Sequence, residues 1–150
     1  MPVTLTSLED TERLARTLVQ HAPEGALLVL SGPLGAGKTT LVQALGRALG
    51  SAAQISSPTY TLIHEYPAPG GVLVHIDAYR LGAAGADVAG ALFELGLDDY
   101  LGRARLVAVE WGEALLGAFP KALLVTLALE PSSRGLRRRA QVTRGDRTLL

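Results

Sequence analysis

The stretch LLVLSGPLGAGKTTLVQALG, residues 27–46, decides the fold of this 150-residue chain. Its apolar start predicts a buried β-strand over residues 25–31, and the apolar spacing after the glycines predicts a helix over 38–49. The glycine-rich segment between them matches the pattern G-x-x-x-x-G-K-[ST] at Gly32, Gly37, Lys38 and Thr39. A strand that enters such a loop and continues as a helix is typical of an α/β sheet.

Each part of this P-loop pattern has a chemical use. Glycines let successive backbone N–H groups turn toward phosphate oxygens, and the following helix directs its positive N-terminal end at the same anion. Lys38 would reach the β- and γ-phosphates, and the Thr39 hydroxyl would bind Mg²⁺. The pattern therefore predicts nucleotide contacts from Gly32, Pro33, Leu34, Gly35, Ala36, Gly37, Lys38, Thr39 and Thr40. The structural alternative is a glycine-rich turn that binds nothing.

Strand and helix patterns alternate on both sides of the P-loop. A capping box of Thr6 and Glu9 predicts an early helix with one apolar face, made of Leu8, Leu14, Ala15 and Leu18. A Gly/Ala-rich linker precedes a helix predicted from Asp87 onward. Further strands are predicted within 56–66 and over 3–5, 72–77, 105–111, 122–130 and 137–143. We expect a single P-loop ATPase domain over residues 1–150: α/β, three-layer, with a mostly parallel central sheet and antiparallel edge strands.

The composition narrows the function classes. Hydrophobic residues make up 48% of the chain and charged residues 19%, which indicates a packed core rather than disorder. Cysteine is absent, which excludes disulfides and thiolate metal sites. His21 and His64 lack companions at ligand spacing, so no zinc site is expected. The apolar runs are too short to span a membrane and no secretory signal is visible, so we expect a cytoplasmic protein.

The net charge of zero hides a basic C-terminal segment. Residues 134–147 contain six arginines and one acid, Asp146. Such a segment could contact RNA or an acidic protein face. Because no aromatic residues alternate with these arginines, the sequence favours an edge strand that carries charge to prevent aggregation.

Two carboxylates follow apolar strands and compete for one task. A P-loop enzyme needs an acidic residue at the end of a neighbouring strand to hold Mg²⁺, directly or through water. Asp77 ends one predicted strand and Glu110 ends another. The pattern does not rank them, and either could instead pair with a nearby arginine.

Five segments in one order resemble a known family. They are SGPLGAGKTTLVQAL, SSPTYTLIHEY, HIDAYRL, LFELGLDDYL and VAVEWGE. Together they resemble the TsaE (YjeE) family, the small ATPase of bacterial tRNA threonylcarbamoyladenosine synthesis, over nearly the whole chain. Two departures are visible, because the family often carries Asp at Pro33 and Pro at Gly112. Neither position carries a side chain that we would assign to chemistry.

The resemblance implies a task for each site residue. ATP and Mg²⁺ are the implied cofactors, with Thr39 and Glu110 as metal ligands and Lys38, Asp77 and Glu110 as catalytic residues. Thr59, in the segment SPTY, would sense the nucleotide near the γ-phosphate. Trp111, beside the metal ligand Glu110, resembles the family's functionally important tryptophan and would contact the nucleotide. The implied partners are the TsaB and TsaD proteins, with tRNA reached indirectly or through the basic C-terminal segment. Adenosine 37 of the tRNA would be the modified base.

Alternatives remain open for several residues and for the whole chain. Thr59 and Tyr60 could be ordinary strand residues, Trp111 a core residue, and His75 a hydrogen-bonded residue within the sheet. Arg80 could act as an arginine finger, or a partner could supply one. The chain could also be a small-molecule kinase, a GTPase despite lacking an N-K-x-D segment, or an adaptor that binds nucleotide without turning it over.

Overall fold

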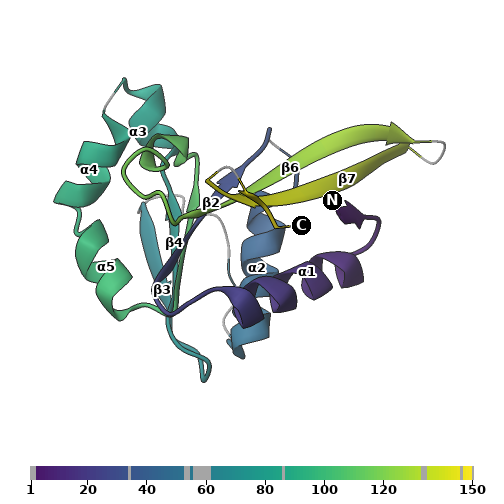
Figure 1. The fold of residues 1–150 in the computed structure, drawn as a ribbon, viewed down its shortest axis with the longest axis horizontal. Coiled ribbons are helices and arrows are strands. Elements are labelled where there is room, and N and C mark those ends of the chain that lie inside the picture. The colour runs from purple at the N-terminus through teal and green to yellow at the C-terminus, as the bar shows by residue number, and fades with distance from the viewer. Residues whose placement is uncertain are drawn as a thin grey trace.

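One mixed sheet organises the chain in the computed structural model (Figure 1), which describes residues 3–149 except 34, 53–54, 56–61, 86, 133–134 and 146. The described part forms an eight-stranded sheet in the order β1-β7-β6-β2-β5-β4-β3, with β8 paired to β7. The strands are β1 (Val3–Leu5), β2 (Ala26–Ser31), β3 (Ile63–Tyr66), β4 (Leu73–Asp77), β5 (Leu106–Glu110), β6 (Leu123–Ser132), β7 (Gly135–Arg144) and β8 (Arg147–Thr148).

The centre of the sheet is parallel and its edges are antiparallel. β6, β2, β5 and β4 run in parallel, whereas β3 pairs with β4, and β7 with β6 and β1, in the antiparallel sense. β2 and β5 are apolar on both faces apart from Ser31 and Glu110 at their ends. This is expected of parallel strands that helices cover on both sides.

Helices form a layer on each face of the sheet (Figure 1). α1 (Leu8–His21) and α2 (Lys38–Leu49) pack one face against buried residues such as Leu28 and Leu106. α4 (Val88–Glu94), α5 (Leu97–Arg103) and the short 3-10 helix η1 (Glu113–Leu115) pack the other face, and α3 (Tyr79–Ala83) lies at its end. The predicted three-layer α/β architecture is confirmed.

The start of α1 differs from the prediction. The N-cap is Ser7, whose hydroxyl accepts a hydrogen bond from the Asp10 N–H, so the predicted capping box of Thr6 and Glu9 is wrong by one residue. Thr6 still contributes, because its N–H and hydroxyl both donate to the Asp10 carboxylate. This register buries Leu14, Ala15 and Leu18 and leaves Leu8, in the first turn, 55% exposed.

The segment after β4 is more helical and more broken than predicted. The Gly/Ala-rich linker contains α3, and the single helix predicted from Asp87 is two helices separated at Gly96. Gly96 has φ 98°, a left-handed conformation that ends one helix and begins the next. Among the described residues, no helix is long and apolar enough to cross a membrane.

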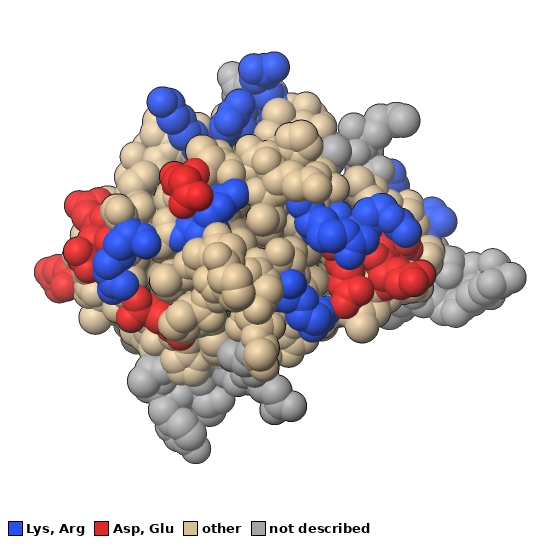
Figure 2. All heavy atoms as spheres, turned by 90° about the horizontal axis from the view of Figure 1, so that it is seen from below, with Lys and Arg blue, Asp and Glu red and all other residues tan. Residues whose placement is uncertain are grey.

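The arginine-rich strand β7 is not an edge strand over its whole length, which corrects the prediction. β1 covers Arg138, Arg139 and Ala140 in an antiparallel ladder. Arg137 and Arg139 both form ion pairs with Glu130 on β6. Figure 2 shows basic and acidic side chains next to one another on the face that it presents, so charge there is mixed rather than of one sign.

Candidate nucleotide site

The P-loop connects the carboxyl end of β2 to the first turn of α2. Gly32 has φ 151°, and a Cβ at that position would lie 2.5 Å from the backbone oxygen of Leu127. Gly37 has φ 102° and directly precedes α2. Only glycine adopts these conformations without strain, so both positions explain why the pattern requires it. The loop leaves the start of α2 open to an anion.

Lys38 is buried at the base of the loop, with 5% of its surface exposed. Its ammonium donates a hydrogen bond to the Gly32 carbonyl oxygen at 2.7 Å and lies 3.5 Å from the ring centroid of Trp111. Burial lowers the pKa of Lys38, and the carboxylates of Glu110, Glu113 and Asp77 oppose that shift. The structure thus holds a buried lysine at the base of the P-loop, covered by the Trp111 ring.

Thr39 and Glu110 meet across the boundary between α2 and β5. The Thr39 hydroxyl donates to Glu110, 3.2 Å from Oε2 and 3.5 Å from Oε1. Glu110 is 4% exposed, and its Oε2 lies 2.6 Å from Nε2 of His75, which is fully buried in β4. Carboxylate and hydroxyl oxygens are the donors that Mg²⁺ prefers. Among the described residues, no three His, Asp or Glu side chains gather into a metal cluster, either here or elsewhere, so the oxygen donors at this position are those of Thr39 and Glu110.

Asp77 lies beside Glu110 because β4 and β5 pair in parallel register, Asp77 opposite Glu110. Its Oδ1 accepts a hydrogen bond from the Tyr79 N–H at 3.0 Å, which fixes the carboxylate at the start of α3. The two competing strand-end acids are therefore neighbours with different surroundings. Glu110 contacts Thr39, whereas the Asp77 carboxylate is half-buried at the rim.

Trp111 follows Glu110 in a strained conformation. Its φ is 62°, the one positive value for a non-glycine residue in the described chain. The indole contacts the Lys38 ammonium and packs at a tilt against the Tyr79 ring, with the ring centroids 5.2 Å apart. The aromatic pair thus closes one side of the site, and Trp111 both covers the Lys38 ammonium and packs against the buried cluster on the α4–α5 face of the sheet.

A hollow of about 210 Å³ opens on the other side of the P-loop. Arg138 of β7 reaches over it and donates to the Gly35 carbonyl oxygen at 3.2 Å. Apolar and hydroxyl side chains make its walls, which suits the faces and edges of an aromatic base. The lining residues are Leu5, Thr6, Ser7, Leu8, Thr11, Ala36, Gly37, Thr40, Leu41, Leu127 and Arg138.

Comparison with known proteins gives a consistent result. The family model "Threonylcarbamoyl adenosine biosynthesis protein TsaE" matches residues 5–140. The chain belongs to the TsaE family. A protein of that name from Haemophilus influenzae is 34% identical over 147 residues, which are 97% of this chain and 90% of the relative. One from Synechocystis is 41% identical over 112 residues, which are 74% of this chain and 69% of the relative.

A solved structure shares the fold. The crystal structure of Bacillus YdiB superposes with a TM-score of 0.67 at 26% identity, covering 97% of this chain and 86% of that one. TsaE membership places the chain in tRNA threonylcarbamoyladenosine biosynthesis and among P-loop ATPases, a family that binds nucleotides. The resemblance inferred from the sequence motifs is therefore confirmed.

In this TsaE chain the predicted site residues fall into three groups. Gly32, Lys38, Thr39, Glu110 and Trp111 converge within the contacts described above, with Asp77 beside them. Of the loop and helix-start residues, Ala36, Gly37 and Thr40 line the hollow, and Pro33 and Gly35 lie in the P-loop between β2 and α2. Leu34 and Thr59, with Tyr60, lie outside the described residues.

The sequence interpretation missed two parts of the site. Arg138 was one of six arginines in the basic segment, and only the β6–β7 pairing carries it to a loop 103 residues earlier in the chain. The second part is the segment that precedes α1, where Leu5, Thr6 and Ser7 line the hollow. The sequence pattern there indicates only the start of a helix. Arg80, the candidate finger, is exposed on α3. No local signal in the sequence marks Arg138 as part of the site.

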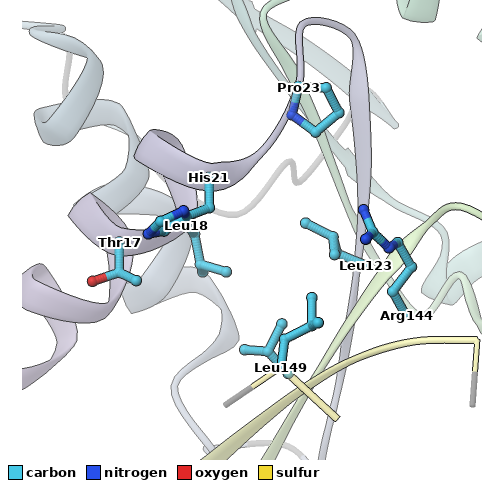
Figure 3. A pocket seen from close by; sticks show the side chains of 8 residues that line it. Thr17, Leu18, His21, Pro23, Leu123, Arg144 and Leu149 are labelled. Atoms are coloured by element: carbon cyan, nitrogen blue, oxygen red, sulfur yellow. The ribbon is translucent and has the colours of Figure 1, made fainter. Parts of the chain in front are cut away.

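A larger hollow of about 390 Å³ lies away from the P-loop. Figure 3 shows Thr17, Leu18 and His21 of α1 facing Leu123, Arg144 and Leu149 across it. None of the P-loop residues lines this hollow. It lies near the start of β2 and β6, the opposite end of the parallel strands from Lys38. Of these two hollows, the smaller one borders the P-loop, through Ala36, Gly37 and Thr40.

Proposed function

We propose that this protein is an Mg²⁺-dependent ATP-hydrolysing subunit that acts on, or resets, the TsaB–TsaD transferase complex during threonylcarbamoyl modification of adenosine 37 in tRNA. The meeting of Thr39 and Glu110 at the mouth of the P-loop is the observation that supports it most. These two oxygen donors fit an ion that keeps several waters and is shared with a nucleotide's phosphates. The cluster also lies where open α/β sheets bind ligands, at the carboxyl ends of parallel strands.

The nucleotide would lie across the P-loop from the hollow to Trp111. The base and ribose would occupy the hollow beside Arg138, whose guanidinium already contacts the loop. The phosphates would follow the backbone N–H groups of the loop toward Lys38 and Thr39. Trp111 and Thr59 would then flank the terminal phosphate from the far side.

Each charged residue would perform one task in hydrolysis. The Lys38 ammonium would leave the Gly32 carbonyl and bind the β- and γ-phosphates, where developing negative charge compensates its burial. Thr39 and Glu110 would hold Mg²⁺, which neutralises charge on the phosphate oxygens when bound. Asp77, fixed by the Tyr79 N–H, would orient the attacking water from the rim of the site.

Turnover would depend on the partner proteins. Arg80, the candidate arginine finger, is exposed on α3. We propose that a partner protein supplies the cation that speeds hydrolysis, so the isolated chain would hydrolyse ATP slowly. The basic segment gives little support for direct tRNA binding, because Arg137 and Arg139 are paired with Glu130 and Arg138 contacts the P-loop. We therefore propose that tRNA is reached through the TsaB–TsaD complex.

The test compares Asp77→Asn with Asp87→Asn. Both aspartates accept a backbone N–H at the start of a helix, Asp77 from Tyr79 and Asp87 from Gly90, and asparagine keeps that oxygen. We expect Asp77→Asn to bind ATP normally but to lose hydrolysis with and without TsaB–TsaD, whereas Asp87→Asn keeps both. ATP binding and phosphate release are measured separately.

Three outcomes would contradict the proposal. Unchanged hydrolysis by Asp77→Asn would remove the catalytic task assigned to that carboxylate. Transfer of the phosphate to a small metabolite rather than to water would indicate a kinase. Equal hydrolysis rates with and without TsaB–TsaD, or copurification that does not depend on ATP, would show that ATP hydrolysis is not coupled to that complex.

A further inference from the structure

His75 occupies an unusual place for a titratable residue. It lies in the middle of β4, is 0% exposed, and faces the same side of the sheet as Glu110. Its Nε2 lies 2.6 Å from Glu110 Oε2. Its other ring nitrogen, Nδ1, is buried without a hydrogen-bond partner within the described part of the chain. The tautomer assigned from this pattern carries the proton on Nε2, which donates to the carboxylate.

Packing alone does not explain this histidine. A leucine or phenylalanine would fill the position without burying an unpaired nitrogen, and β4 supplies Leu73 and Val74 for that purpose elsewhere. The sheet also makes room for the ring. His75 pairs in register with Ala108 of β5, and the small alanine lets the imidazole extend diagonally to Glu110. The hydrogen bond to Glu110 therefore explains why a histidine occupies this position.

We propose that His75 is a positioning residue that holds the Glu110 carboxylate in the orientation needed for Mg²⁺. His75 engages Oε2, which is also the oxygen closer to the Thr39 hydroxyl, at 3.2 Å. Oε1, 3.5 Å from that hydroxyl, is the carboxylate oxygen that His75 leaves available to the metal. Groups behind a metal ligand commonly fix its orientation in this way. This task presupposes the Mg²⁺ site proposed above and adds a residue that does not itself touch metal or nucleotide.

The test separates donor position from polarity. The amide nitrogen of glutamine can reach the position of the imidazole Nε2, whereas that of asparagine is too short to do so. We therefore expect His75→Gln to keep Mg²⁺ affinity within about threefold of wild type and His75→Asn to lose about 10–100-fold. His64→Gln is the matched control, because His64 faces His75 across β3 and β4 but bonds to Tyr66 rather than Glu110.

The readout does not depend on turnover. Mg²⁺ is titrated into protein saturated with a non-hydrolysable ATP analogue, and the fluorescence of the single tryptophan, Trp111, reports binding next to Glu110. Analogue affinity without Mg²⁺ and the thermal midpoint are measured for each variant. We expect the analogue affinity and the thermal midpoint to be similar for His75→Gln and His75→Asn. If His75 served only the packing of the sheet, the variant that loses Mg²⁺ affinity would also lose analogue affinity or thermal stability.

Failure of this inference differs from failure of the proposed Mg²⁺ site. If Glu110→Gln loses Mg²⁺ affinity while both His75 variants keep it, the metal site stands and the positioning role is wrong. If both His75 variants lose affinity equally, the donor position is irrelevant and the inference is again wrong. If Glu110→Gln itself binds Mg²⁺ as wild type does, the metal site proposed above is wrong.

Discussion

Replacing Gly37 with alanine tests whether the P-loop conformation serves the ligand. Gly37 has φ 102°, and a Cβ there would lie 3.3 Å from both Cδ and Nε of Arg138. A left-handed conformation costs an alanine about 1–2 kcal/mol. The close contact is with a flexible side chain that can move, so the backbone term dominates. A domain of this size loses about 2–4 °C of thermal midpoint per kcal/mol, which gives an expected loss of about 2–8 °C.

The matched control is Gly102→Ala. Gly102 lies in α5, and a Cβ there would meet no atom within 4 Å. Alanine is favoured over glycine in a helix by about 1 kcal/mol, so this change should raise the midpoint by about 2–4 °C. The two substitutions are chemically identical, and they are expected to shift stability in opposite directions.

The assay is thermal unfolding followed by circular dichroism, with and without a non-hydrolysable ATP analogue and Mg²⁺. At 100 times its Kd a ligand stabilises the folded state by about 2.7 kcal/mol, so Gly102→Ala and wild type should show the same rise of several degrees. Gly37→Ala should show little or none, because strain at the entry of α2 misplaces the loop N–H groups. A normal midpoint for Gly37→Ala together with a full ligand-induced shift would refute this reasoning.

Two further substitutions test the charges around the loop. Arg138→Ala should weaken nucleotide affinity about two- to fivefold, because a hydrogen bond to the base or ribose contributes about 0.5–1 kcal/mol. Arg137→Ala should leave nucleotide affinity unchanged, and calorimetric titration measures the affinity of both variants. Equal losses of affinity in the two variants would contradict the placement of the base beside Arg138. Burial lowers the pKa of Lys38 from its usual 10.5, so the unfolded chain keeps that proton to a higher pH than the folded one. As pH rises from the lowered pKa to 10.5, the free energy of unfolding of wild type should therefore increase relative to that of Lys38→Met, and denaturant unfolding measures both. If the two free energies followed the same pH dependence, burial would not lower the pKa of Lys38.

Local sequence patterns were sufficient for strands β1 to β7, the P-loop pattern and α2, but not for the two-residue strand β8. Their signals are short: an apolar run, glycines at fixed spacing, and an apolar period that stops at Gly50. Errors arose where neighbouring residues share a property. Thr6 and Ser7 can both cap a helix, and only the observed hydrogen bond to the Asp10 N–H assigns the cap to Ser7. Likewise the apolar period continues through residues 88–103, while the left-handed Gly96 divides the helix.

The rest of the site depends on strand pairing, which one sequence does not contain. Asp77 and Glu110 could not be ranked from their patterns, because both end apolar strands. The structure distinguishes them by which one faces Thr39 on α2. Arg138 reaches the loop only because β7 folds back along β6, and His75 reaches Glu110 only because Ala108 lies opposite it. Such relations are set by register between distant segments rather than by local propensity.

The buried polar residues give the strongest argument that these contacts form one functional unit. Among the described residues, four polar or charged side chains are buried: Thr11, Lys38, His75 and Glu110. Three meet around the P-loop, and Thr11 lines the hollow beside it. Burying a polar or charged side chain lowers stability relative to an apolar residue of similar size. Trp111, with its strained backbone, lies in the same cluster. Destabilising features concentrated at one place in an otherwise apolar core support the nucleotide site proposed above.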